Sequence, residues 1–200
     1  MKIRSAASAA LAVAAALILV GCANTTDSGS MPGMNHGSDS SASTEADFNN
    51  ADVMFAQMMI PHHEQAIEMA DMLLAKDGID SDIVTLAEDI KAAQQPEIDQ
   101  MEEWLQAWGA DMGGMGGMGG MGHDDGMMSD DYMAAFQDAT GAEASRLFLE
   151  QMIEHHEGAI DMSQNEVDNG QDSDAIDMTE SLIYTKTPEI PQMEQLLTEL

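Results

Sequence analysis

The sequence has 200 residues, of which 37 are acidic and six are basic, so its formal net charge at pH 7 is −31. A chain with this charge repels nucleic acid and attracts cations, which excludes a nucleic-acid-binding function. Because Cys22 is the only cysteine, disulfide bonds within the chain and thiolate metal sites are excluded as well. Chemistry with soft metals must therefore use the six histidines and the 20 methionines.

Residues 1–21 have the pattern of a bacterial lipoprotein signal peptide. Lys2 and Arg4 precede a run of small and apolar residues that is too short to span a membrane comfortably. The run ends in LVGC, which resembles a lipobox and predicts cleavage before Cys22 and lipidation of this cysteine. The alternative is a plain signal peptide followed by a free thiol. With lipidation, we expect the exported chain to be anchored to the outer face of the cytoplasmic membrane or to the periplasmic side of the outer membrane.

Four segments follow the signal peptide. Residues 22–46 are rich in serine, threonine, asparagine, glycine and acids, which predicts a disordered stalk. Residues 47–109 and residues 140–200 each contain two helical patterns with a short polar break between them, which predicts two helical hairpins. Residues 110–139 begin with a Met-Gly-Gly repeat and predict a flexible connection. We expect both hairpins to form one domain.

The two hairpin segments are copies of each other. FAQMMIPHHEQAIEMA at residues 55–70 returns as FLEQMIEHHEGAIDMS at residues 148–163, with an offset of 93 residues. PEIDQMEEWL at residues 96–105 returns as PEIPQMEQLL at residues 188–197, with an offset of 92 residues. No alternating β-strand pattern is present. The repeat predicts an all-α four-helix bundle with approximate twofold symmetry.

A Met-x-x-His-His motif occurs once in each copy. At 100° per residue, both histidines of a motif lie beside its methionine on the apolar face of their helix. One interpretation is that the histidines bond to carboxylates and the methionines only fill the core. Because the motif repeats at symmetry-related positions, we prefer metal ligation, with Glu97 and Glu189 holding the imidazole rings in place. The motif residues are Met59, His62 and His63 in the first copy, and Met152, His155 and His156 in the second.

The methionine of the motif indicates which metal is bound. Ferritin-like di-iron bundles have Glu-x-x-His on two helices, whereas this chain has methionine in place of that glutamate. A thioether is a poor ligand for hard cations and a good one for copper(I) or silver(I). Zinc at the histidines is also possible, but it does not account for the methionines.

The segments MMIPHHEQAIEMA, MIEHHEGAIDM and PEIxQME resemble an exported bacterial family known as domain of unknown function 305. The resemblance covers about residues 50–200 and implies a ferritin-like bundle that binds copper or silver outside the cytoplasm. One departure is Lys186 and Thr187 where the first copy has the family's Gln94 and Gln95, so the two halves need not bind metal equally. The ligands that the resemblance implies are Met59, His62, His63, Met69, Met101, Met152, His155, His156, Met162 and Met193.

A second group of methionines and histidines lies outside the hairpins. A flexible connection does not require sulfur, so these residues are interpreted as mobile accessory sites of low affinity for the same metal. The accessory residues are Met112, Met115, Met118, Met121, His123, Met127 and Met128 in the connection, and Met31, Met34 and His36 in the stalk.

The leading functional hypothesis is a membrane-tethered protein that buffers, sequesters or transfers copper(I) or silver(I), with a metal-handling protein as a possible partner. It is not expected to be an enzyme. The alternatives are a ferritin-like metallo-oxidase with iron or copper, and an acidic lipoprotein that binds a partner while its histidines are structural.

Overall fold

The computed structural model describes residues 47–110 and 126–200. The predicted signal peptide, the lipidation site Cys22 and the stalk lie outside the described residues. The same is true of most predicted accessory ligands, namely Met31, Met34, His36, Met112, Met115, Met118, Met121 and His123.

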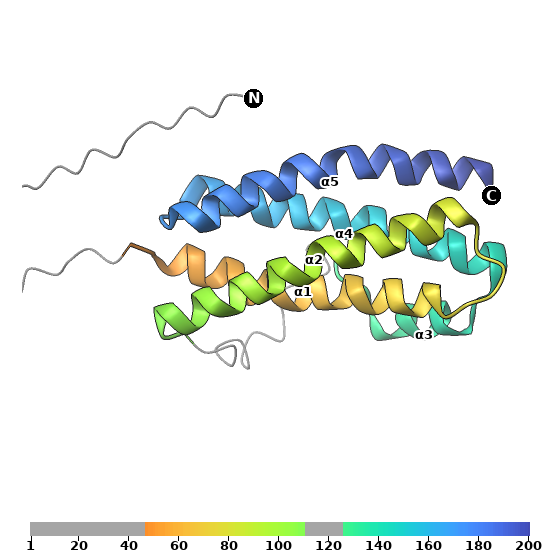
Figure 1. The fold of residues 1–200 in the computed structure, drawn as a ribbon, viewed down its shortest axis with the longest axis horizontal. Coiled ribbons are helices and arrows are strands. Elements are labelled where there is room, and N and C mark those ends of the chain that lie inside the picture. The colour runs from red at the N-terminus through yellow and green to blue at the C-terminus, as the bar shows by residue number, and fades with distance from the viewer. Residues whose placement is uncertain (1–46, 111–125) are drawn as a thin grey trace, which may run out of the picture. The chain divides into compact units, whose positions relative to one another are not determined.

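Four long helices form two hairpins, as the repeat predicts. Helices α1 (Asn50–Leu74) and α2 (Ser81–Trp108) make the first hairpin, and α4 (Gly141–Asn169) and α5 (Ser173–Glu199) make the second (Figure 1). The hairpins meet mainly through α1 and α4. The predicted all-α, ferritin-like four-helix bundle is thus confirmed, and within the described ranges no helix is both long enough and apolar enough to cross a membrane.

The turns of the two hairpins end in the same kind of helix cap. Asp80 precedes α2 and accepts a hydrogen bond from the backbone N–H of Asp82 at 2.8 Å. Asp172 precedes α5 at the corresponding position of the repeat and accepts one from the N–H of Asp174 at 2.9 Å. A carboxylate at this position satisfies N–H groups that have no partner within the helix, so each turn sequence sets the start of its second helix.

Helices α1 and α4 are antiparallel and closely packed. The start of α1 lies at the end of α4, where the Asn49 side-chain amide donates to the backbone carbonyl of Asn169 at 2.9 Å. Small residues are fully buried in both helices, including Ala66 on α1 and Ala159 on α4. Because the alanine side chain is small, the two helices can approach each other closely at these positions. The larger motif residues can then meet at the helix interface.

A fifth helix, α3 (Asp130–Asp138), lies within the segment that was predicted to be a flexible connection, so that part of the prediction is wrong. The hydroxyl of Ser129 accepts a hydrogen bond from the N–H of Tyr132 at 3.3 Å and caps the helix. Phe136 is buried, and its ring centroid lies 6.3 Å from that of Phe148 on α4. The cap and the buried aromatic ring stabilise a helix that the neighbouring Gly/Met-rich composition does not indicate.

The residues just before α3 are fixed to the bundle. The side chain of Gln65 on α1 accepts from the N–H of Met128 at 2.7 Å and donates to its carbonyl at 3.0 Å. The Met128 side chain is 8% exposed and belongs to the core. The predicted mobility of Met128 is therefore wrong, because two backbone hydrogen bonds and burial hold this residue in place.

We predict that Gly126→Ala destabilises the protein more than Gly78→Ala. Both glycines have nearly the same positive φ, +75° and +77°, so the backbone strain of alanine should be similar at both positions. A Cβ at Gly126 would overlap with the carbonyl oxygen of Glu154, whereas a Cβ at Gly78 would have no atom within 4 Å. Urea unfolding should show an additional loss of about 1–3 kcal/mol for Gly126→Ala. Equal losses would show that the segment at Gly126 does not pack against α4 in solution.

Candidate metal centre

Two histidines meet where the hairpins join. The ring centroids of His62 on α1 and His155 on α4 are 3.6 Å apart, with 35° between the ring planes. Both side chains are buried. Because these residues occupy the same position in the two copies, the approximate twofold axis of the repeat passes between their rings.

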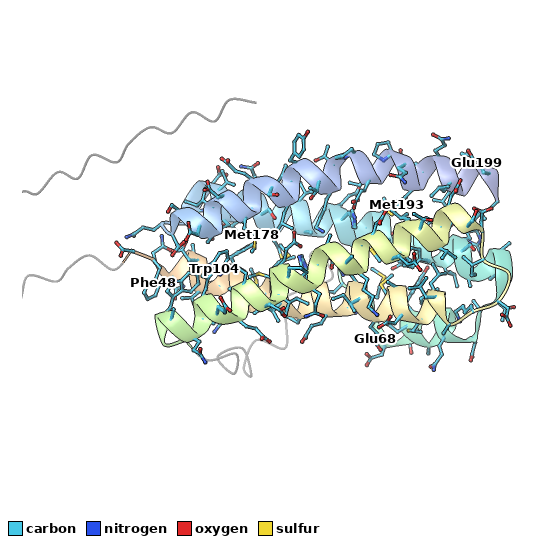
Figure 2. All side chains as sticks on the ribbon, in the orientation of Figure 1. Phe48, Glu68, Trp104, Met178, Met193 and Glu199 are labelled. Atoms are coloured by element: carbon cyan, nitrogen blue, oxygen red, sulfur yellow. The ribbon has the colours of Figure 1, made fainter. Side chains whose placement is uncertain are left out.

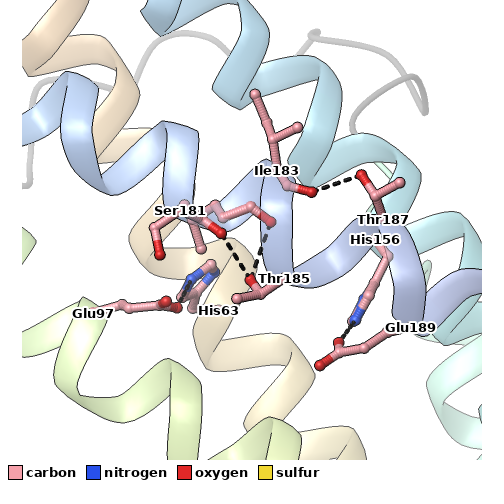
Figure 3. A network of polar contacts seen from close by, with 9 residues as sticks. His63, Glu97, His156, Ser181, Ile183, Thr185, Thr187 and Glu189 are labelled. Carbon is pink, nitrogen blue, oxygen red and sulfur yellow. Dashed lines mark hydrogen bonds and ion pairs between the residues drawn. The ribbon is translucent and has the colours of Figure 1, made fainter.

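The other two histidines of the motifs each bond to a carboxylate within their own hairpin. The Nε2 atom of His63 lies 2.8 Å from an Oε2 oxygen of Glu97, and the Nε2 atom of His156 lies 2.6 Å from Oε2 of Glu189 (Figure 3). Both imidazoles are fully buried, whereas the carboxylates are partly exposed. The predicted association of Glu97 and Glu189 with the histidines is thus present in both copies.

These contacts fix which ring nitrogen is left for another partner. A carboxylate accepts the hydrogen bond, so Nε2 carries the proton and Nδ1 has a free lone pair in His63 and His156. In both residues Nδ1 is buried and has no hydrogen-bond partner, and the same is true of Nε2 in His155. A buried nitrogen without a partner is costly, and coordination of a cation would remove that cost.

All three of these histidines are electrically neutral near pH 7. Burial lowers the pKa of His63 and of His156, although the carboxylate beside each ring acts in the opposite direction. Burial and the neighbouring histidines hold the pKa of His155 well below its ordinary value. Neutral imidazole is the form that binds metals.

Lys186 is a buried lysine close to this centre. It is 5% exposed, burial lowers its pKa, and its charge acts on His63, His155 and His156. Burial alone would raise the pKa of Glu189, but the hydrogen bond and charge of His156, together with Lys186, lower it. The corresponding residue of the first copy is Gln94, which is uncharged and also buried. The two halves of the centre therefore differ in this ionisable residue, although their histidines occupy equivalent positions.

Five of the six predicted methionine ligands are fully buried. Figure 2 labels one of them, Met193 on α5. Met59 and Met101 belong to one cluster of core side chains, and Met69, Met152 and Met193 belong to another. Each cluster thus contains the motif methionine and the PEIxQME methionine of one hairpin. The sixth, Met162, is partly exposed and lines a separate pocket with Met54 and Met58.

The described part of the chain offers no carboxylate-rich metal site. Among those residues, no three histidine, cysteine, aspartate or glutamate side chains are placed to hold one metal ion. A metal at the histidines therefore needs further donors, and the buried thioethers are the donor type present in the surrounding core. This donor set favours a soft monovalent cation over iron or zinc.

A buried pair of carboxyl groups, which the sequence analysis did not identify, ties the start of α1 to the turn after α4. Asp52 accepts hydrogen bonds from the backbone N–H groups of Gln171 and Asp172, both at 2.9 Å. Burial acts to raise the pKa of Asp52, but hydrogen bonds from Glu166 and from backbone N–H groups lower it. Burial and the neighbouring Asp52 raise the pKa of Glu166 to about 8. With this raised pKa, the carboxyl group of Glu166 is mostly protonated at neutral pH.

We predict that Glu166→Gln removes a pH dependence from the stability of the protein. Because the pKa of Glu166 is raised on folding, its contribution is complete below its ordinary value of 4.5 and is lost as the pH rises towards 8. Glutamine can still donate to Asp52 but cannot ionise. Between pH 5 and pH 8, the unfolding free energy of the parent protein should fall relative to the variant by on the order of 2 kcal/mol. A constant difference over this range, measured by urea unfolding, would contradict the raised pKa of Glu166.

The family model described as Domain of unknown function (DUF305) matches residues 52–197. No curated protein matches the chain. Several solved structures share the fold. A DUF305 protein from Streptomyces coelicolor, named a secreted protein, is 29% identical with a TM-score of 0.68, over 74% of this chain and 91% of its own. A DUF305 fragment from Deinococcus radiodurans is 29% identical with a TM-score of 0.67, over 76% of this chain and 98% of its own.

The third structure is CopM in a Cu(II)-bound form. It is 32% identical to this chain with a TM-score of 0.64, over 74% of this chain and 96% of its own. CopM also has Cu(I)-bound and Ag-bound structures. Proteins that bind copper and silver therefore share the fold described above. From the family match over residues 52–197 and these structural similarities, the chain belongs to the DUF305 family.

Proposed function

We propose that this protein binds copper(I) or silver(I) at the histidine centre and buffers, sequesters or transfers the metal outside the cytoplasm. The observation that carries the proposal is the paired arrangement of His62 and His155, with partnerless nitrogens on His63, His155 and His156. Histidines with a purely structural role are expected to have hydrogen-bond partners for their buried nitrogens, and here three such nitrogens have none.

The surrounding donors support a soft metal. Met59 and Met152 precede the histidines by one helical turn, and both are fully buried. Glu97 and Glu189 accept hydrogen bonds from Nε2 of His63 and His156, which we call the outer histidines. These bonds direct the Nδ1 atoms of the two rings away from the carboxylates. CopM, which binds Cu(I) and Ag, provides support from a member of the same structural group.

A competition titration tests this proposal. The purified protein should withdraw copper(I) from a chromophoric chelator under anaerobic conditions, with a defined stoichiometry. The ring signals of the motif histidines in NMR spectra should change in the same titration. If the chelator keeps all of the copper at micromolar concentrations, the proposed function is wrong.

We propose binding rather than catalysis. The metallo-oxidase alternative requires a centre with open positions for oxygen or substrate and a nearby acid or base, whereas the proposed ligands are buried in a packed core. Oxygen consumption by the copper-loaded or iron-loaded protein is the direct measurement, and we expect none above that of the free metal. The third hypothesis, a metal-free binding module, predicts no response in the chelator titration.

We also propose that lipidation of Cys22 tethers the exported protein to a membrane. The support is the LVGC sequence after a basic and apolar segment. Changing Cys22 to alanine should move the protein from the membrane fraction to the soluble exported fraction. Retention of the variant in the membrane fraction would contradict this anchor.

A further inference from the structure

A small pocket lies between α1 and α4, close to the start of α1. Its volume is about 80 Å³. Three methionine side chains line it, Met54 and Met58 from α1 and Met162 from α4, and Glu166 is also among the lining residues. The pocket is therefore unusually rich in sulfur for its size.

The antiparallel packing of the two helices brings these side chains together. Met54 and Met58 are four residues apart and share one face of α1, while Met162 and Glu166 are four residues apart and share one face of α4. All three methionines are partly exposed, in contrast to the six methionines that are buried in the described core. The Sδ atom of Met54 already accepts a hydrogen bond from the side-chain amide of Asn50 at 3.1 Å. Its sulfur is thus accessible to a polar or cationic partner.

The repeat does not explain this pocket. The residues of the second copy that correspond to Met54 and Met58 are Leu147 and Gln151, neither of which has a sulfur atom. The residue of the first copy that corresponds to Met162 is Met69, which is buried in the core. The residues equivalent to the three pocket methionines therefore do not form a second such pocket, so the twofold packing alone does not require three thioethers here.

Three neutral thioethers in a solvent-accessible pocket match the ligand preference of a soft monovalent cation. The lining residues include no lysine, arginine or histidine, so none of them repels such an ion. We propose that Met54, Met58 and Met162 form a surface site for one copper(I) or silver(I) ion, separate from the histidine centre.

A silver(I) titration followed by NMR tests the site directly. The full chain is labelled with ¹³C at the methionine methyl groups, and silver nitrate is added in a chloride-free buffer. We expect the methyl signals of Met54, Met58 and Met162 to change together in one binding step. In the variant M54L/M58L/M162L, the protein should bind one silver ion fewer, with an unchanged circular dichroism spectrum.

The matched control is M72L/M133L/M178L, which removes three partly exposed methionines outside the pocket. The control should keep the silver stoichiometry of the parent protein. If the pocket variant binds as much silver as this control, or if the three methyl signals change at different silver concentrations, the proposed site is wrong.

This titration tests the histidine centre and the pocket site separately. Ring signals of His62, His63, His155 and His156 report the histidine centre, while the three methyl signals report the pocket. A response of the methyl groups alone overturns the proposed centre and supports the pocket. A response of the histidines alone overturns the pocket.

Discussion

Changing His62 and His155 together to glutamine should weaken the tightest copper(I) binding by at least about a hundredfold. The two rings are 3.6 Å apart at the junction of the hairpins, and no other described histidine pair joins α1 to α4 so closely. Loss of two imidazole donors leaves only thioethers and the outer histidines near the axis. Because each factor of ten corresponds to about 1.4 kcal/mol, an effect of this size is easily resolved by competition with a chelator.

The control for this prediction is the pair Glu64→Gln and Glu157→Gln. Glu64 and Glu157 follow the two motifs at equivalent positions and are exposed, so their replacement changes charge but no proposed ligand. Because glutamine could disturb the packing of the buried histidines, M59L/M152L provides a second test with nearly unchanged side-chain volume. Unchanged copper affinity in both the histidine variant and the methionine variant would refute the proposed centre.

Changing Lys186 to glutamine should strengthen copper(I) binding by about tenfold or more. Lys186 is buried near three motif histidines, and its ammonium group opposes a cation at the same centre. Two unit charges several ångströms apart at an effective dielectric constant of about 20 repel each other by a few kcal/mol. Glutamine is the residue found at the corresponding position of the first copy, Gln94, so the repeat itself provides a tolerated replacement.

The reverse substitution, Gln94→Lys, is the matched counterpart. It places a second buried ammonium group at the position related by the repeat, and it should weaken binding by a similar factor. Chelator competition on both variants and the parent protein at one fixed pH provides the comparison. If Lys186→Gln leaves the affinity unchanged, the charge of Lys186 does not act on the bound metal.

The sequence by itself determined the helical bundle and the candidate residues. Helix periodicity is local, so the 3.6-residue pattern placed all four motif histidines on buried faces, as the structure shows. The two offsets of the repeat predicted two equivalent hairpins. The helical positions of Glu97 and Glu189 likewise made them candidate partners of the histidines in both copies of the repeat, and both bond to a histidine.

Contacts between distant segments were decided only by the tertiary structure. The packing of α1 against α4 brings His62 to His155. The packing within each hairpin brings His63 and His156 to their carboxylates. No spacing within one helix specifies these contacts. Helix α3 was missed because its stability comes from Phe136 packing on α4, not from the composition of the connection.

The role of Met162 changed for the same physical reason. Its helical position predicted a core ligand, but the antiparallel packing places it with Met54 and Met58 in a solvent-accessible pocket. A sequence pattern determines which face of a helix is apolar. Which apolar side chains then meet, and which remain open to solvent, depends on the helix that packs against that face.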